Sequence, residues 1–238
     1  MKLWITMAVA GALLGAVAGL EPWNRFGGGD AAPIPGLTST TRAEQLKELE
    51  RLRIEGIRLV TEKKYREAVA VFLKLNYVNH HDPFSYQQLA MVVARAGADE
   101  AEKLVKKEMS PRPNAADTER ILGGMFFYAK ADDRAVKHLD VYLAANPDDP
   151  AAMYYTGAIT RKKGDNKEAI RVLSKVVEKE PGHYYAYVEL QQAYEAMGND
   201  AQAAKMLGLA LKNSPSNKEG VCCGLPPDKK ATEKGKKT

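Results

Sequence analysis

The chain has few of the residues that carry catalysis or hold a small fold together. Its 238 residues include two cysteines, Cys222 and Cys223, which are adjacent, and four histidines. This pair cannot build a disulfide scaffold, and no Cys/His spacing typical of a zinc site occurs. No nucleophile has an evident base partner, and no glycine-rich phosphate loop follows a strand. We therefore predict that the protein is not an enzyme and that it holds no metal and no cofactor.

Basic charge is also scarce outside the C-terminal tail. The net charge is +5 and the pI is near 9.0, but six lysines and three acidic residues within residues 218–238 account for +3. A nucleic-acid binder carries its positive charge on the folded part of the chain. We therefore predict no nucleic-acid partner and a disordered basic tail over residues 218–238. In an oxidising compartment, Cys222 and Cys223 form a disulfide with a partner or a second copy; the alternative is that they have no role.

A long apolar run occurs only at the N-terminus. Residues 3–20 contain no charged side chain, and a helix of this length spans about 27 Å, close to the membrane core of about 30 Å. Trp4 and Trp23 flank the run, as in an aromatic belt. Two interpretations stay open for residues 1–26: a retained signal anchor, or a signal peptide cleaved after the small residues 16–18.

Both interpretations place the rest of the chain outside the cytoplasmic membrane. It is then either a single-pass inner-membrane protein with an extracytoplasmic, periplasmic domain, or a protein secreted after cleavage. Gly11, Gly15 and Gly19 form a smooth stripe for helix packing in the membrane, although Gly/Ala-rich signal sequences also produce this spacing. Residues 27–41 are rich in glycine and proline and are expected to form a flexible linker.

Residues 42–217 show helical periodicity and a sequence repeat. Ala135, Ala169 and Ala203 recur every 34 residues, and a proline follows each at the same distance. Offsets of 34, 33, 34 and 34 residues define five units, which begin at Leu49, Pro83, Ala116, Pro150 and Tyr184. Asp82-Pro83 and Asp149-Pro150 are expected to start helices, with an acidic cap and proline at the first helical position.

These units resemble the tetratricopeptide repeat family, in which each unit is a pair of helices. The last unit carries the matching residues Tyr187, Leu190, Tyr194, Ala203, Leu207 and Pro215, with Gln191 in place of the usual glycine. The resemblance implies an all-α, right-handed solenoid of about five repeats. Small residues such as Gly157 let the paired helices approach closely. Because no capping helix follows Ser216, we expect the last unit to be frayed or covered by a partner.

The resemblance also implies a concave face, lined by the first helix of each unit, that binds peptides or partner helices. The residues placed there are Phe84, Gln87, Met91, Arg95, Arg120, Phe127, Tyr128, Tyr154, Arg161, Lys162, Tyr185 and Gln192. Aromatic and cationic side chains are typical of recognition surfaces, although the rings can instead pack between helices. The family's lysine/asparagine clamp for a C-terminal carboxylate is absent, because Arg53, Ile57, Arg120, Gly124, Tyr154 and Ala158 hold those positions.

The sequence therefore predicts a non-catalytic scaffold or adaptor of the cell envelope. It docks other envelope proteins or peptide segments on the concave face and helps to assemble or stabilise a larger complex. The alternative is a periplasmic, chaperone-like assembly factor that binds peptide segments transiently, as in pilus, secretion or cytochrome c maturation systems. A chain terminus or an acidic segment is the expected ligand. The N-terminal helix contacts the membrane, and self-association stays open.

Overall fold

A computed structural model describes residues 42–78, 83–110 and 115–214. This part of the chain contains ten α-helices and no strand. In chain order they are α2 (Arg42–Thr61), α3 (Tyr65–Val78), α4 (Pro83–Ala96), α5 (Ala98–Met109), α6 (Ala115–Tyr128), α7 (Asp132–Ala145), α8 (Pro150–Lys162), α9 (Asn166–Lys179), α10 (Tyr184–Ala196) and α11 (Asp200–Asn213).

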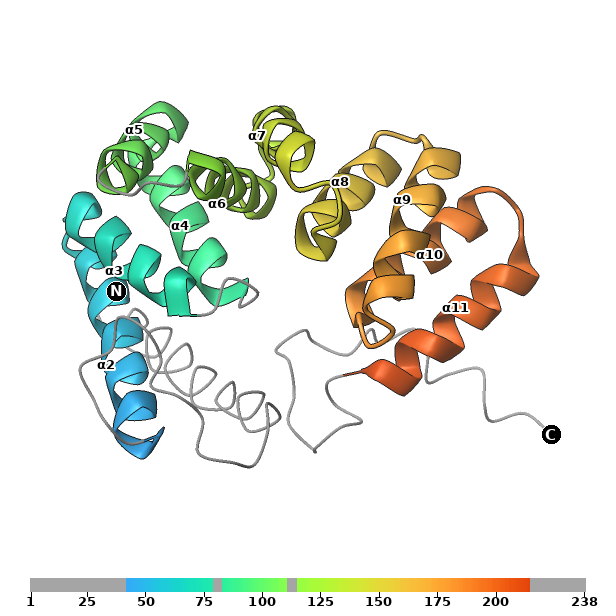
Figure 1. Cartoon of the computed structure of the whole chain (residues 1–238), viewed down its shortest axis with the longest axis horizontal. Coiled ribbons are helices and arrows are strands. Elements are labelled where there is room, and N and C mark those ends of the chain that lie inside the picture. Colours follow the sequence, from blue (N-terminus) through green and yellow to red (C-terminus); the bar gives the residue numbers. More distant parts are fainter. Residues whose placement is uncertain (1–41, 79–82, 111–114, 215–238) are drawn as a thin grey trace, which may run out of the picture.

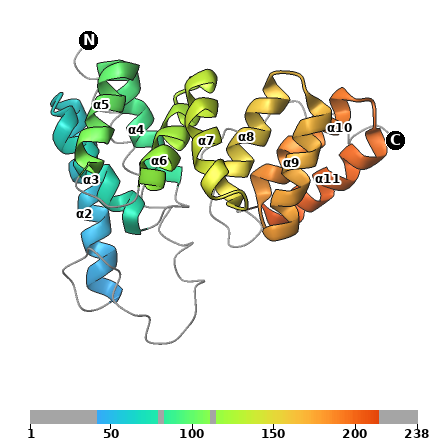
Figure 2. The ribbon, with the colours of Figure 1, turned by 45° about the horizontal axis from the view of Figure 1, so that its top comes forward.

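The helices pack in five consecutive pairs, from α2–α3 to α10–α11, and form an arch (Figure 1). The pairs follow one another in chain order along it (Figure 2). The first helices of successive pairs touch, α4 with α6, α6 with α8 and α8 with α10. Successive second helices make comparable contact only between α3 and α5, so the array curves with its first helices inside. The prediction of an all-helical repeat solenoid is confirmed.

The turn inside each pair contains one residue with a left-handed backbone. These residues are Lys63 (φ 61°), Gly97 (φ 91°), Lys130 (φ 60°), Gly164 (φ 92°) and Gly198 (φ 70°). They are separated by the same 34, 33, 34 and 34 residues that define the repeat in the sequence. A residue with a Cβ atom is strained in this region, whereas glycine is not. The first and third turns therefore carry a strain that the other three avoid.

Replacing Lys63 by glycine is expected to raise the free energy of unfolding by about 1 kcal/mol, because glycine has no Cβ atom and adopts the left-handed backbone without steric strain. The matched control is Lys74→Gly, since Lys74 is equally exposed but lies inside α3. Glycine there lowers stability by about 1 kcal/mol. Urea unfolding followed by circular dichroism measures both. A loss of stability in Lys63→Gly would contradict the strained turn.

Glycines set the distance between the two helices of a pair. A Cβ atom added to Gly123 would lie 2.7 Å from Leu139 Cδ2, and one added to Gly157 would lie 2.7 Å from Leu173 Cγ. Both leucines are fully buried. The role predicted for Gly157 is confirmed. In the fifth unit Gln191 replaces this glycine, and Leu207, the counterpart of Leu139 and Leu173, is 46% exposed.

Polar residues close the N-terminal ends of the later helices. Asp149 Oδ1 accepts a hydrogen bond from Ala152 N (2.8 Å), with Pro150 as the first residue of α8. Asp165 and Asn199 cap α9 and α11 in the same way. The predicted start of α8 is confirmed, and α4 begins at Pro83 as expected. The helix α2 begins at Arg42, where the helical domain was predicted to begin, seven residues before the first repeat unit at Leu49.

Several predicted features lie outside the described residues. They are the membrane helix of residues 1–26 with Gly11, Gly15 and Gly19, the linker 27–41, the helix cap Asp82 and the tail 218–238 with Cys222 and Cys223. Within residues 42–78, 83–110 and 115–214, no helix combines the length and apolar character needed to span a membrane. The last unit is not frayed within the described residues, because its second helix, α11, is helical through Asn213.

Candidate functional site

Five aromatic rings from three consecutive first helices form a cluster on the inner side of the arch. Tyr86 belongs to α4, Phe127 and Tyr128 belong to α6, and Tyr154 and Tyr155 belong to α8. The Tyr155 ring lies 4.6 Å from Phe127, 5.9 Å from Tyr128 and 6.0 Å from Tyr86, measured between centroids. Such spacings favour edge-to-face and offset ring contacts. The cluster therefore joins the second, third and fourth units.

The deeper rings of this cluster are inaccessible. Tyr86, Phe127 and Tyr155 are buried, whereas Tyr128 and Tyr154 are half-buried. Burial raises the pKa of the Tyr86, Tyr154 and Tyr155 phenols above its ordinary value, and the nearby Glu189 carboxylate adds to the rise for Tyr154. These phenols stay neutral at physiological pH. Of the two interpretations given for the predicted groove rings, packing between helices applies to Phe127. Its ring stabilises the fold and is not presented to a ligand.

An apolar pocket of about 270 Å³ opens between α4 and α6, beside this cluster. It is lined by Gln87, Ala90, Met91, Val93, Ala94, Tyr128 and Ala129. Three of the predicted groove residues, Gln87, Met91 and Tyr128, meet here. Met91 is 41% exposed, although large apolar residues are usually covered. The volume suits apolar side chains of a docked segment better than a large cofactor, which needs roughly 300–1,000 Å³.

Cationic side chains lie near the pocket and the aromatic cluster. Lys162 Nζ lies 4.9 Å from the centre of the Phe127 ring and 3.5 Å from Asp132 Oδ1. Arg161 forms an ion pair with Glu189 on α10. Arg95, in the last turn of α4, is exposed. The inner face thus combines an apolar hollow with a cationic margin, part of whose charge is neutralised by acidic neighbours.

Arg120 differs from the prediction, because it lies in the core and not in the groove. Its guanidinium donates hydrogen bonds to the Tyr86 hydroxyl and to Asn76 Oδ1 (3.3 Å). Asn76 Nδ2 in turn donates to Ser85 Oγ (3.1 Å). The Asp117 carboxylate, which is more exposed, lies 3.8 Å away. Arg120 therefore ties α3, α4 and α6 together and is not available to a partner.

The twelve predicted groove residues divide by accessibility. Exposed are Gln87, Met91, Arg95, Lys162 and Tyr185; half-buried are Phe84, Tyr128, Tyr154, Arg161 and Gln192; buried are Arg120 and Phe127. At one end of the array the buried Arg53 guanidinium stacks on the Phe84 ring at 4.8 Å. Towards the other end the rings of Tyr154 and Tyr185 lie 6.5 Å apart. Of the accessible residues, the α4–α6 pocket brings together Gln87, Met91 and Tyr128.

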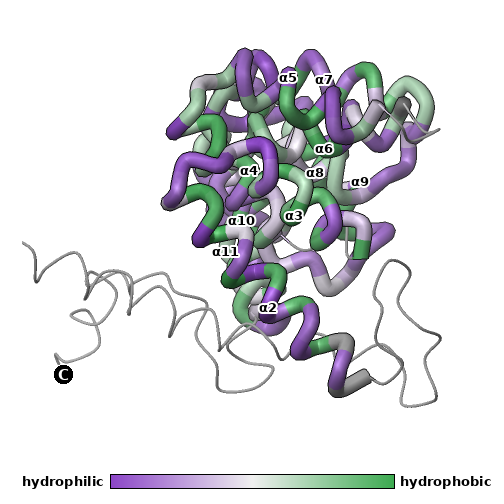
Figure 3. Tube along the Cα trace, turned by 90° about the vertical axis from the view of Figure 1, so that its left-hand side faces the viewer, coloured by the Kyte–Doolittle hydropathy of each residue, from purple (hydrophilic) through white to green (hydrophobic). Residues whose placement is uncertain are grey.

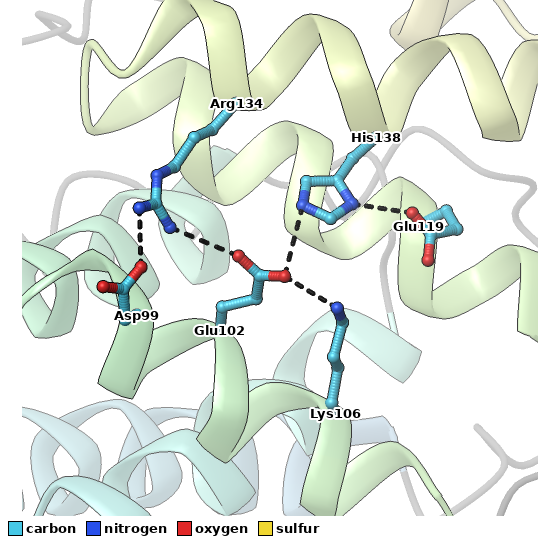
Figure 4. A network of polar contacts seen from close by, with 6 residues as sticks. All are labelled: Asp99, Glu102, Lys106, Glu119, Arg134 and His138. Carbon is cyan, nitrogen blue, oxygen red and sulfur yellow. Dashed lines mark hydrogen bonds and ion pairs between the residues drawn. The ribbon is translucent and has the colours of Figure 1, made fainter.

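A polar network around His138, which the sequence did not predict, joins α5, α6 and α7 (Figure 4). His138 Nδ1 lies 2.7 Å from Glu119 Oε2 and is the donor, since a carboxylate only accepts. His138 Nε2 lies 3.7 Å from Glu102 Oε1, and this oxygen accepts a hydrogen bond from Lys106 Nζ (2.7 Å). Arg134 bridges Glu102 and Asp99. Six side chains from three helices are therefore fixed by one another.

The surroundings of His138 indicate a structural role. Its ring is buried and stacks on Phe126, with centroids 5.6 Å apart and planes at 14°. Within the described part of the chain, no group of three or more His, Cys, Asp or Glu side chains is arranged to hold a metal ion. In the sequence, Glu119 occupies the position that Met153 and Tyr187 hold in the next two units. That exchange makes room for an acid beside His138.

Comparison with known proteins gives relatives that are longer than this chain. It is 27% identical over 161 residues to Hsp70-Hsp90 organizing protein 3 of Arabidopsis thaliana, a match that covers 66% of this chain and 27% of that protein. For Hsp70-Hsp90 organizing protein 2 of the same plant, the identity is 25% over 157 residues, with 66% and 26% covered. The chain thus spans about a quarter of the length of these curated relatives.

Among solved structures, a crystal structure of MamA aligns with a TM-score of 0.48 at 22% identity and covers 68% of this chain and 96% of that one. The crystal structure titled "YrrB: a TPR protein with an unusual peptide-binding site" aligns with a TM-score of 0.46 at 19% identity, covering 74% and 93%. Two family models, both described as tetratricopeptide repeat, match residues 133–184 and 161–220. The two models thus show tetratricopeptide repeats within residues 133–220, and the helix pairs that precede this part follow the same spacing.

Proposed function

We propose that the protein is a non-catalytic adaptor that docks a segment of another protein on the inner face of its arch. The observation that carries this proposal is the apolar pocket between α4 and α6, where Gln87, Met91 and Tyr128 stay accessible. Exposed apolar and aromatic side chains around a hollow are the usual anchors of a docking site. The matched relatives are named as organizing proteins, which supports an adaptor and not an enzyme.

The chemistry of the face defines the segment that fits it. An apolar side chain enters the pocket beside Met91, and the Gln87 amide supplies a donor and an acceptor for the backbone of the segment. Arg95 and Lys162 favour acidic residues on its flanks, because both residues are exposed; of the two, only Lys162 has an ion pair with a described residue, Asp132. The expected ligand is thus an extended or helical segment with an apolar anchor and acidic flanks.

The proposed location is the cell envelope. It rests on residues 3–20, whose length and apolar character fit a signal anchor that holds the repeat domain outside the inner membrane. Secretion after cleavage is the alternative, since the small residues 16–18 fit a cleavage site. In either case the partners are envelope proteins or their segments. Fractionation of cells, followed by protease treatment of intact spheroplasts, distinguishes the two locations.

Site-specific photo-cross-linking in intact cells tests the docking face. A benzoylphenylalanine at position 91 is expected to yield a cross-linked partner, because Met91 borders the pocket. The matched control is position 141, since Val141 is 57% exposed but lies on the second helix α7. A single adduct of fixed stoichiometry supports an adaptor, and a ladder of many adducts supports the chaperone-like alternative. Equal yields from positions 91 and 141 would show that the inner face is not the docking site.

A charge placed in the pocket is expected to weaken this docking at least tenfold, because a buried acid costs more than the roughly 1.4 kcal/mol that a tenfold change requires. The variant is Met91→Glu, and Val141→Glu is its control, with affinity unchanged within about twofold. Binding of the purified, cross-link-identified segment by fluorescence anisotropy gives both values. An alanine change at Tyr154 is less informative, because that ring also packs against Phe127 and Tyr155.

A further inference from the structure

Three residues occupy the same position in the second, third and fourth units. Arg95, Tyr128 and Lys162 each precede the left-handed residue of their turn by two positions. Because α6 packs against both α4 and α8, these residues form a row across the C-terminal ends of the three first helices, which we call the edge row. Hydrophobic and hydrophilic residues alternate along these helices (Figure 3). The corresponding residues of the first and last units, Thr61 and Ala196, are uncharged, so the positive charge of the row is confined to α4 and α8.

The edge row runs past the apolar pocket. Tyr128 lines the pocket, and Arg95 directly follows Ala94, which also lines it. The Tyr128 ring and Lys162 Nζ lie 5.3 and 4.9 Å from the centre of the Phe127 ring, so they are neighbours. Arg95 and Lys162 are both exposed. The pocket between α4 and α6 therefore has an accessible cation on each side along the row.

Both cations can take a further partner. Arg95 has no acidic partner among the described residues. Asp132 Oδ1 lies 3.5 Å from Lys162 Nζ and takes up at most one of the three donors of the ammonium group. Lys130, in the turn after α6, adds an exposed positive charge. Other acids of this region are engaged elsewhere: Asp99 by Arg134, Asp133 by Lys163 and Glu189 by Arg161.

The positions at which the family clamps a terminal carboxylate offer no accessible cation in this structure. Two of them hold arginines, Arg53 and Arg120, and both side chains are buried. The other four are uncharged: Ile57, Gly124, Tyr154 and Ala158. The accessible cations instead lie apart, at the two ends of the edge row. Such an arrangement suits two separate acidic side chains better than one terminal carboxylate.

We propose that the docked segment is internal to its chain and lies extended along the edge row, with an acidic residue at Arg95, an apolar residue in the pocket and a second acidic residue at Lys162. This inference rests on the proposed function and adds the conformation of the segment and the place of its charges. Neighbouring helices lie about 8–10 Å apart, so α4 and α8 are separated by about 16–20 Å. An extended chain covers this distance in about six residues.

The alternation of side chains in an extended chain fits the same pattern. Residues at i, i+2 and i+6 face the same way, so an acid, an apolar anchor and a second acid all face the protein in either chain direction. A helix would instead dock through several apolar anchors at i, i+3 or i+4, and i+7. The edge row offers one apolar pocket flanked by charges. Beyond Lys162 the exposed Glu195 on α10 disfavours a further acid, so the acidic pair ends there.

Binding of synthetic peptides to the full chain, measured by fluorescence anisotropy, tests this inference. The probes are serine peptides of eleven residues with blocked termini and glutamates at the third and ninth positions; leucine is at the fifth position in one probe and at the seventh in the other. The better of the two is expected to bind about threefold tighter than a peptide of the same composition with adjacent glutamates, which reaches only one cation. Proline at the sixth position faces solvent in the extended segment and is expected to change the affinity less than about twofold.

Two variants assign the charges to the edge row. Arg95→Gln and Lys162→Gln are each expected to abolish the advantage of the separated glutamates. Lys137→Gln is the matched control and keeps it, because Lys137 is exposed but lies on the second helix α7. Circular dichroism confirms that each variant keeps its helical content.

The outcomes separate this inference from the proposed function. An advantage that persists in Arg95→Gln and Lys162→Gln, a large loss with proline, or binding that requires a free C-terminal carboxylate would overturn the extended internal segment. Docking itself would still stand if binding depends on the leucine and is weakened by Met91→Glu. Peptide binding that depends on neither would overturn the proposed function, and this inference with it.

Discussion

Replacement of Arg120 by alanine is expected to lower the free energy of unfolding by about 3 kcal/mol. The guanidinium is buried and donates to the Tyr86 hydroxyl and to Asn76 Oδ1, which are themselves buried. Alanine leaves both acceptors without this donor and creates a cavity between α3, α4 and α6. Each unsatisfied buried group costs about 1–3 kcal/mol, and the lost packing adds to it.

Urea unfolding followed by circular dichroism measures this loss, and two variants define its origin. Tyr86→Phe removes one acceptor and is expected to cost about 1 kcal/mol. Arg66→Ala is the control, because Arg66 also links two helices, through Glu108, but is exposed; its effect is much smaller. If Arg120→Ala is as stable as Arg66→Ala but no longer binds the docked protein segment, Arg120 belongs to the docking face and not to the core.

The repeat phase was predictable because it depends on local requirements. A glycine or a strained residue must stand in each turn, and a small residue must stand where paired helices cross. Gly164 and Gly198 meet the first requirement, and Gly123 and Gly157 meet the second. These requirements recur at a fixed spacing in the sequence. The start of α2 at Arg42 agrees with the predicted start of the helical domain, although its first two turns precede the first repeat unit.

The accessibility of the groove residues was less predictable. Helical periodicity shows which side of a helix a residue occupies, but not how deeply a neighbouring helix covers it. Arg120 and Phe127 lie on the predicted side and are nevertheless buried, because α4 and α8 pack against α6. The network around His138 depends on residues 19 and 36 positions away, Glu119 and Glu102, which no helical spacing relates.

Replacement of Gly56 by alanine is expected to lower the free energy of unfolding by about 2 kcal/mol, although alanine favours a helix by about 1 kcal/mol. A Cβ atom at this position would lie 2.8 Å from Cζ and 3.0 Å from Cδ1 of Phe72. The Phe72 ring is fully buried between α2, α3 and α4, and its centroid lies 6.5 Å from that of the Phe84 ring. These neighbours leave the ring no space to move away from a new methyl group. The overpacking therefore outweighs the gain in helix propensity.

A second substitution at Phe72 is expected to relieve this clash. Phe72→Leu alone costs about 1–2 kcal/mol through lost packing, but Gly56→Ala combined with Phe72→Leu loses less than the sum, with a coupling of at least about 1 kcal/mol. Gly208→Ala is the matched control. It raises stability by up to about 1 kcal/mol, because its new Cβ meets no neighbour. Gly56→Ala as stable as Gly208→Ala would show that α2 and α3 are not held at the distance the structure gives.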